Sequence, residues 1–302
     1  MAEGGGLSAP FRFLVAESEP PADREKRRRS VGRSSGETFV DVLGALVPDA
    51  RSTRITPADA DGDAPDAAAI ARYDGVFLTG SPLHLYQDTP ETRRQVAFMR
   101  AVFASGTPSF GSCAGLQVAT VAAGGSVRPM GARREAGFAR RLTPTDAGRD
   151  HPLMAGRPAA FDAPAVHGDE VDRLPEGATL IASNRVTGVQ AAEIRFDRGI
   201  FWGVQYHPEL SLEEVAAALR RQSDDLIEHQ LARAPDDVEQ TATLIDALAR
   251  EPERVDLAWR LGLDEQVTDP AQRRRELRNF IDHLVTPVRA ERHRASAGAT
   301  AV

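Results

Sequence analysis

The sequence predicts an α/β protein with a wound, mostly parallel central sheet flanked by helices, followed by an α-helical C-terminal extension. Three observations support this fold class. Short apolar runs alternate with helical stretches up to about residue 123, short β-like runs dominate from about 137 to 206, and the pattern is helical after Leu210. Strands that alternate with helices are typical of parallel sheets with crossover helices.

The first part of the chain supplies the parallel strands. Apolar runs predict strands at Phe11–Ala16, Asp74–Thr79 and Thr107–Phe110. Apolar residues at helical spacing predict helices at Thr38–Leu46, Glu91–Ala104 and Leu116–Ala123. Between the first strand and the first of these helices, Glu17–Gly36 holds two prolines and a basic cluster from Arg24 to Arg33. We expect a long surface loop there, either simply solvated or acting as a lid or docking patch beside the active site.

The second part is first β-rich and then helical. Short runs predict antiparallel or mixed strands at Phe138–Leu142, Ala178–Ser183, Val189–Phe196 and Gly199–Tyr206. Candidate helices follow at Leu212–Gln230, Asp236–Ala249, Pro252–Leu261 and Pro270–Leu284. The predicted organisation is a disordered N-terminus at 1–10, an α/β domain at 11–212, a helical extension at 213–288 and a disordered tail, rich in Ala, Arg and Ser, at 289–302.

Composition excludes several classes of protein. The chain has 302 residues, of which 41% are hydrophobic and 27% charged, as expected of a globular protein. Its net charge of −7 argues against a general nucleic-acid binder. No apolar run approaches the ~20 residues of a membrane span, and the Gly-rich start does not resemble a signal peptide. We therefore expect a cytoplasmic protein without nucleic-acid or membrane partners.

The single cysteine, Cys113, lies in the pattern Gly111-Ser112-Cys113-Ala114-Gly115, between a predicted strand and a predicted helix. One thiol forms no internal disulfide and no multi-thiolate metal site. A sharp strand-to-helix turn can expose a nucleophile, and flanking glycines let the neighbouring backbone approach closely. The start of the helix favours the thiolate, and the N–H of Ala114 would face a developing oxyanion. The simpler alternative is an inert buried thiol.

A second segment, Gly203-Val204-Gln205-Tyr206-His207-Pro208-Glu209, can supply the base that a cysteine nucleophile requires. Glu209 lies two residues beyond His207, so in an extended segment both side chains point to the same side. Glu209 could then orient the imidazole. Taken alone, the triplet could equally be a histidine at the end of an edge strand followed by a solvated carboxylate.

Three motifs in this order carry a family resemblance. FGSCAGLQ, GVQYHPE and the strand and loop DGVFLTGSP together resemble the class I (triad) glutamine amidotransferases, in particular stand-alone proteins similar to the glutaminase domain of GMP synthase. The resemblance covers roughly residues 11 to 215. It implies a class I amidotransferase-like fold and a catalytic triad of Cys113, His207 and Glu209.

The resemblance also implies supporting roles. The oxyanion would be held by main-chain N–H groups of Gly80, Ser81 and Ala114, with Ser81 standing where the family commonly has glycine. Gln117 and the segment His167-Gly168-Asp169 would bind the substrate, the latter near its α-amino and α-carboxylate groups. The alternative for His167 is a turn residue preceding Gly168.

The implied reaction is acyl transfer through a γ-glutamyl thioester, with no cofactor and no metal. His84, His151, His229, His283 and His293 show no spacing typical of metal ligands. The substrate would be glutamine or another γ-glutamyl compound. Because no ATP-using synthetase signature is present, we consider three hypotheses: a glutaminase that passes ammonia to a separate synthetase subunit, a stand-alone γ-glutamyl hydrolase or transferase, and a non-catalytic partner-binding scaffold.

Overall fold

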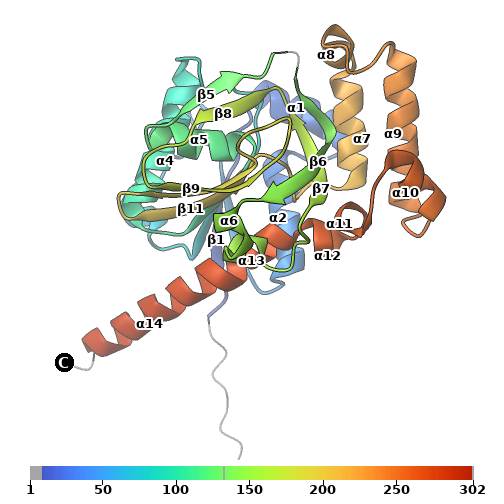
Figure 1. Cartoon of the computed structure of the whole chain (residues 1–302). Coiled ribbons are helices and arrows are strands. Elements are labelled where there is room, and N and C mark those ends of the chain that lie inside the picture. Colours follow the sequence, from blue (N-terminus) through green and yellow to red (C-terminus); the bar gives the residue numbers. More distant parts are fainter. Residues whose placement is uncertain (1–8, 132, 301–302) are drawn as a thin grey trace, which may run out of the picture.

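A mixed β-sheet forms the centre of the molecule. The computed structural model describes residues 9–131 and 133–300, with the backbone alone at 296–300. In this part of the chain, nine strands pair in the order β2-β1-β3-β4-β11-β10-β9-β6-β7 (Figure 1). They are β1 Arg12–Ala16, β2 Arg51–Ile55, β3 Gly75–Leu78, β4 Ser109–Ser112, β6 Glu135–Pro144, β7 Phe161–His167, β9 Ala178–Ser183, β10 Ala191–Phe196 and β11 Gly199–Val204. The first five in spatial order are parallel and the rest antiparallel. Two further strands, β5 Ser126–Pro129 and β8 Asp169–Arg173, form a small separate sheet.

Both faces of the sheet are buried. In β1, Phe13 and Val15 join one apolar cluster, and Leu14 and Ala16 join another, as the two-residue period of a strand requires. The second cluster lies beneath α3 Ala67–Ile70, α4 Pro90–Ser105 and α5 Ala114–Ala122. The first cluster is covered by α2 Ser35–Leu46 and by a segment from the C-terminal region, α13 Arg275–Phe280 with the short π-helix η2 Ile281–Val285. Residues far apart in the sequence therefore share one core.

The remaining helices of the C-terminal half form a third apolar cluster beside β6, with Phe138 of that strand among its members. In Figure 1, α7, α9 and α10 stand together along one side of the molecule. The bounds are α7 Leu212–Arg221, α8 Ser223–Glu228, α9 Pro235–Arg250, α10 Val255–Leu261, α11 Glu265–Thr268 and α12 Pro270–Arg273. Two short elements, α6 Asp146–Arg149 and η1 Pro152–Met154, follow β6.

A buried ion pair ties α13 to the body of the protein. The Arg157 guanidinium donates to both carboxylate oxygens of Glu276 at 2.7 Å, and neither side chain is exposed. The hydroxyl of Tyr206, the residue before His207, donates to the same carboxylate at 2.9 Å. Arg157 also donates to Gln266 Oε1 at 2.9 Å. Paired and hydrogen-bonded in this way, the two charges are tolerated in the interior.

The predicted fold class is confirmed, but the sequence analysis missed four strands. β2 is an edge strand with the polar sequence RSTRI and exposed side chains, so it offers no apolar run. β8 (DEVDR) is similarly polar, β5 is only four residues long, and β7 is interrupted by a proline. Each lies at or near the edge of a sheet, where burial imposes little pattern on the sequence.

The prediction of a surface loop over Glu17–Gly36 is wrong. Pro21–Val31 forms the helix α1, which begins at a proline in its first turn and ends at Gly32 in the left-handed conformation. Three of the basic residues of this segment pair with carboxylates outside α1: Arg24 with Asp59, Arg27 with Glu214 and Arg28 with Glu37. The run of like charges indicated a solvated loop because these partners lie on other parts of the chain.

The predicted disordered tail is also wrong as far as residue 300. The chain continues from η2 into α14, Thr286–Thr300, which projects from the body in Figure 1. Two arginine side chains hold its first turns against the body of the protein. The Arg289 guanidinium lies 4.2 Å from the Phe11 ring centroid, and Arg292 donates to the Tyr73 carbonyl at 3.0 Å. Residues 1–8 and 301–302, also predicted to be disordered, lie outside the described residues. None of the described helices is long and apolar enough to span a membrane.

Candidate active site

The carboxyl ends of three adjacent parallel strands meet at one point. Leu78 of β3 pairs with Gly111 of β4, and Val204 of β11 pairs with Ser112 of β4. The three strands therefore end at the same level, and the residues that follow them are brought together: Gly80 after β3, Cys113 after β4 and His207 after β11. Ligands of α/β sheets gather at such carboxyl ends.

Cys113 occupies a strained turn between β4 and α5. Its backbone has φ 52° and ψ −110°, outside the regions that most residues adopt, and its N–H donates to Val204 O at 2.8 Å. The turn requires the glycines on either side, because a Cβ on Gly111 would lie 2.8 Å from the backbone of Gly115. Cys113 immediately precedes the first turn of α5, whose N–H groups have no partner within the helix. The sharp strand-to-helix turn predicted at Cys113 is thus present.

His207 and Glu209 form a hydrogen-bonded pair beside this turn. His207 Nδ1 lies 2.7 Å from Glu209 Oε1, and Ser112 Oγ donates to the same oxygen at 2.8 Å. Burial by itself would lower the pKa of His207. The Glu209 carboxylate and a hydrogen bond with Cys113 outweigh burial and raise the pKa to about 10. The imidazolium is therefore the stable form at neutral pH, with Cys113 as its second partner.

The loop after β3 closes the site from the other side. A Cβ on Gly80 would lie 2.7 Å from His207 Cε1 and 3.7 Å from Cys113 Cβ, so only glycine fits there. Ser81 turns its hydroxyl away, donating to Ser18 O at 2.9 Å, which explains how serine replaces glycine without blocking the loop. Within the described residues, the main-chain N–H groups of Gly80 and Ser81 have no acceptor. Ala114 is the first residue of α5, so its N–H also has no partner within the helix.

Cys113, His207 and Glu209 line a cavity of about 580 Å³. Gly80, Ser81, Gln117, His167, Gly168 and Asp169 line it as well, so nine of the ten predicted site residues border one space, and Ala114 adjoins it next to Cys113. The Gln117 amide donates to Asp169 O at 3.1 Å and to Gln205 Oε1 at 3.2 Å. A carboxylate oxygen of Asp169 forms a hydrogen bond of 2.6 Å with His84 Nδ1.

His167 is held within the protein at the edge of this cavity. Its Nε2 lies 2.9 Å from a carboxylate oxygen of Glu135, and its Nδ1 lies 3.0 Å from the Asp169 carbonyl. Each ring nitrogen thus lies against an oxygen atom of the protein, and neither remains for a ligand. Burial would raise the pKa of Glu135, but hydrogen bonds from His167, Asn184 and Gln190 lower it. His167 therefore fixes the Gly168–Asp169 loop and does not itself present a polar atom to the cavity.

Comparison with known proteins decides the family. Residues 42–223, more than half of the chain, match the family model "Glutamine amidotransferase class-I". The chain belongs to the class I glutamine amidotransferases. As a member of this family it is an enzyme of the cysteine-dependent, amide-cleaving kind, as the motifs predicted.

Two relatives of known activity are similar in sequence to this amidotransferase. It is 36% identical, over 282 residues, to a γ-glutamyl-L-1-hydroxyisopropylamide hydrolase from a Pseudomonas species; the alignment covers 92% of this chain and 94% of the relative. It is 31% identical, over 188 residues, to the GMP synthase of Thermomicrobium roseum, covering 62% of this chain. The chain spans only about a third of the length of that synthase (32%).

Solved structures show the same fold. A glutamine amidotransferase from Thermotoga maritima superposes with a TM-score of 0.61 at 16% identity, covering 91% of this chain and 98% of the other. One from Methylobacillus flagellatus gives a TM-score of 0.53 at 21% identity, covering 85% and 96%. At these identities the likeness concerns the fold alone.

Several residues of this amidotransferase site were not found from the sequence. Glu135 holds His167, Ser112 holds Glu209, and His84 holds Asp169, each through a contact between distant residues. Glu19 and Lys26, from the segment expected to be a loop, also line the cavity. The pair Ser112–Glu209 could have been suspected, since Ser112 adjoins Cys113. The other contacts depend on strand pairing that the sequence pattern does not reveal.

Proposed function

We propose that this chain is a stand-alone hydrolase of γ-glutamyl amides, releasing glutamate and an amine, with Cys113 as nucleophile, His207 as acid and base, and Glu209 as the group that orients His207. The observation that carries the proposal is the near-complete alignment with the Pseudomonas γ-glutamyl amide hydrolase, which covers 92% of this chain and 94% of that relative. The GMP synthase alignment covers a much smaller share of both chains.

The geometry supports an acyl-transfer mechanism. The Cys113 thiolate attacks the γ-carbonyl carbon, and the resulting oxyanion accepts hydrogen bonds from the N–H groups of Ala114 and of the Gly80–Ser81 loop. His207 keeps its Nδ1 on Glu209, so its other nitrogen gives a proton to the leaving amine as the C–N bond breaks. Water then attacks the thioester, His207 accepts its proton, and glutamate leaves as the thiolate re-forms.

A second candidate is a glutaminase that passes ammonia to a separate synthetase subunit. The likeness to the glutamine-hydrolysing GMP synthases favours it, since this chain spans only about a third of the Thermomicrobium synthase. The 580 Å³ cavity counts against it, because release of ammonia needs little space on the leaving-group side.

Hydrolysis by the purified chain tests the proposal. Glutamine and γ-glutamyl derivatives of small amines are incubated with the wild type and with Cys113→Ala, and glutamate and free amine are quantified. We expect kcat/KM for at least one substituted amide to exceed that for glutamine, with no turnover by Cys113→Ala. A wild type that hydrolyses glutamine alone, and faster when a synthetase is added, would support the second candidate instead.

A further inference from the structure

The cavity extends well beyond the three triad residues. On one side lie Gln117 and the His167–Asp169 segment. On the other side is a wall that we call the α1–α7 wall, made of residues from α1, the loop before it, α7 and the residue that follows α7. Its polar members are Glu19, Asp23, Lys26, Arg27, Arg221 and Gln222. The triad chemistry does not require this wall. The space beside it is large and lined by polar groups, so it can hold a further part of the ligand.

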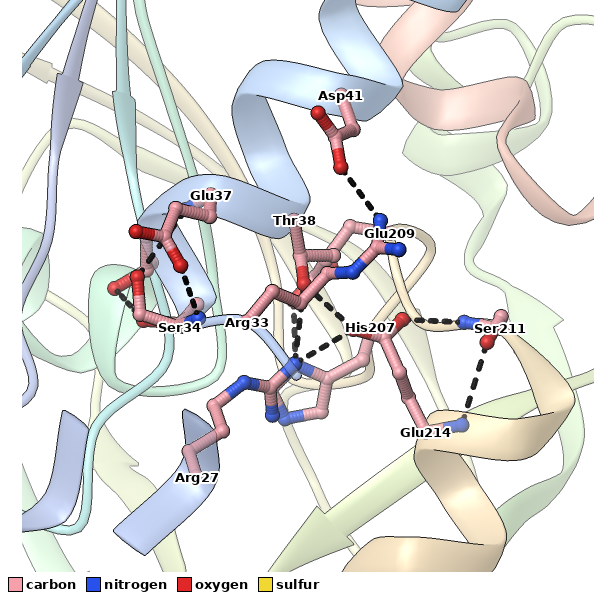
Figure 2. Close-up of polar contacts among 12 residues, drawn as sticks. Arg27, Arg33, Ser34, Glu37, Thr38, Asp41, His207, Glu209, Ser211 and Glu214 are labelled. Carbon is pink, nitrogen blue, oxygen red and sulfur yellow. Dashed lines mark hydrogen bonds and ion pairs between the residues drawn. The ribbon is translucent and has the colours of Figure 1, made fainter. Parts of the chain in front are cut away.

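The wall is anchored next to the reacting atoms. Ser18 donates its N–H to Thr79 Oγ1 at 3.0 Å and accepts from Ser81 Oγ at 2.9 Å. Glu19 follows directly, so it is fixed against the loop that carries the expected oxyanion donors. On the other side, Arg27 donates to Glu214 at 2.9 Å, and Thr38 donates to the same oxygen (Figure 2). These contacts hold α1 and α2 against α7, beside His207 and Glu209 (Figure 2).

The chemistry determines which half of the substrate meets this wall. His207 must protonate the nitrogen of the departing amine, so the amine lies on the His207 side of the scissile bond. The chain leads from His207 through Leu210 directly into α7, whose residues line the cavity there. The glutamyl half is then left for the opposite side, near Gln117 and Asp169.

Glu19 presents a carboxyl group to the cavity. Its Oε2 accepts from the Ser35 N–H at 3.2 Å, and the Ser35 hydroxyl is a second hydrogen-bond partner of the carboxyl. Burial raises the pKa of this carboxyl, although Arg27 and Ser35 act in the opposite direction. A carboxyl group has about four acceptor positions, so these two donors leave it able to accept a directed hydrogen bond from a ligand.

The wall carries charges of both signs. A carboxylate on the amine, as in a γ-glutamyl amino acid, would be attracted by Lys26 and Arg221 but repelled by Glu19 and Asp23. An ammonium, as in a γ-glutamyl diamine, would meet the reverse combination. A hydroxyl group can both donate to Glu19 and accept from a cation, so it satisfies both signs of charge.

We propose that the α1–α7 wall is the subsite for the amine half of the substrate, that it takes a short, uncharged, hydroxylated amine, and that Glu19 accepts the hydrogen bond of that hydroxyl. This inference rests on the proposed γ-glutamyl amide hydrolysis and names its substrate class. It also gives α1 a role: the helix positions one wall of the specificity pocket.

A matched substrate series tests the subsite. The γ-glutamyl amides of 2-amino-1-propanol, isopropylamine, alanine and 1,2-diaminopropane differ only in the group that would face the wall: hydroxymethyl, methyl, carboxylate or ammonium. For the wild type we expect kcat/KM to be highest for the hydroxylated amide, by roughly 10-fold or more over isopropylamide, the effect of one hydrogen bond to a charged group. Glu19→Ala should reduce this ratio to nearly one.

Two further variants complete the design. Glu25→Ala makes the same change on the exposed side of α1, at a residue that does not line the cavity, and should leave the ratio as in the wild type. Glu19→Gln keeps the side-chain size and an acceptor for Ser35, so it should fold and give an intermediate ratio even if Glu19→Ala is unstable.

The outcomes separate the two proposals. If the wild type cleaves substituted amides but prefers the alanine or diamine derivative, or if Glu19→Ala and Glu19→Gln keep the wild-type ratio, the subsite assignment is overturned while the hydrolase function stands. If the wild type cleaves none of the substituted amides, the proposed function fails first, and the subsite fails with it.

Discussion

Removing one partner of the buried pair Arg157–Glu276 should destabilise the protein strongly. In Glu276→Leu, the Arg157 guanidinium keeps the Gln266 oxygen at 2.9 Å and a main-chain carbonyl at 3.4 Å. It loses the carboxylate with which it pairs among the described residues, and it has no exposure to water. An uncompensated buried charge of this kind costs about 3–5 kcal/mol. That is a large share of the roughly 5–15 kcal/mol that stabilises an ordinary domain.

The double variant isolates the cause. Arg157→Leu combined with Glu276→Leu removes both charges, so it should be clearly more stable than either single variant. Equilibrium urea unfolding, followed by far-UV circular dichroism, gives the midpoint and the slope m for each protein. As a surface control, Glu239→Leu breaks the exposed pair with Arg220 and should leave the midpoint nearly unchanged. A single-variant loss below about 1 kcal/mol, or a double variant whose loss equals the sum of the two single losses, would refute the reasoning.

Four other predictions concern the triad and the C-terminal region. Cys113→Ala should lower hydrolysis at least about 1,000-fold with an unchanged melting temperature, and a glutamine-like electrophile should label only Cys113 in mass spectrometry; appreciable residual activity would exclude it as nucleophile. Glu209→Gln should lose less activity than His207→Ala, and equal losses would give Glu209 another role. The pKa of His207 is about 10 in the folded state, above the ~6.5 of an unfolded histidine, so its contribution to stability is full below about pH 6.5 and is lost as the pH rises towards 10. Between about pH 7 and 10, the melting temperature of Glu209→Gln should therefore fall less than that of the wild type. Parallel falls would contradict the pairing of Glu209 with a protonated His207. A chain truncated after Leu210 should aggregate, and a soluble, fully active truncation would show that the extension is detachable.

The parts of the fold that were predicted correctly are those where burial imposes a pattern. Apolar runs such as Gly75–Leu78, buried on both faces, indicate strands, and the sharp turn at Cys113 could be predicted because glycines must flank it. For these elements the sequence pattern and the local geometry have the same physical cause. The contact between His207 and Glu209 is also present, but the segment is not extended as predicted: Pro208 and Glu209 lie in a turn, in which the Leu210 N–H donates to the His207 carbonyl at 3.3 Å.

The failures have a different cause. Arg24, Arg27 and Arg28 were interpreted as a solvated run because their carboxylate partners lie on other elements. Likewise, both ring nitrogens of His167 are occupied, by Glu135 from an adjacent strand and by the Asp169 carbonyl, which no spacing rule indicates. Long-range ion pairs leave no periodic trace in a sequence, so helix α1 and the inner support of the site became visible only in three dimensions.

The position of α13 and η2 on the sheet bears on how the protein is made in the cell. Leu277, Phe280 and Val285 complete the apolar cluster begun by Phe13, and they are synthesised after every strand of the sheet. Cys113, His207 and Glu209 all precede them, yet one face of the sheet stays partly uncovered until these three apolar residues emerge from the ribosome. Until then a nascent chain exposes an aromatic surface that includes Phe77 and Phe110, and surfaces of this kind are prone to aggregate during synthesis. A premature stop codon shortly before Leu277 would leave that surface permanently exposed.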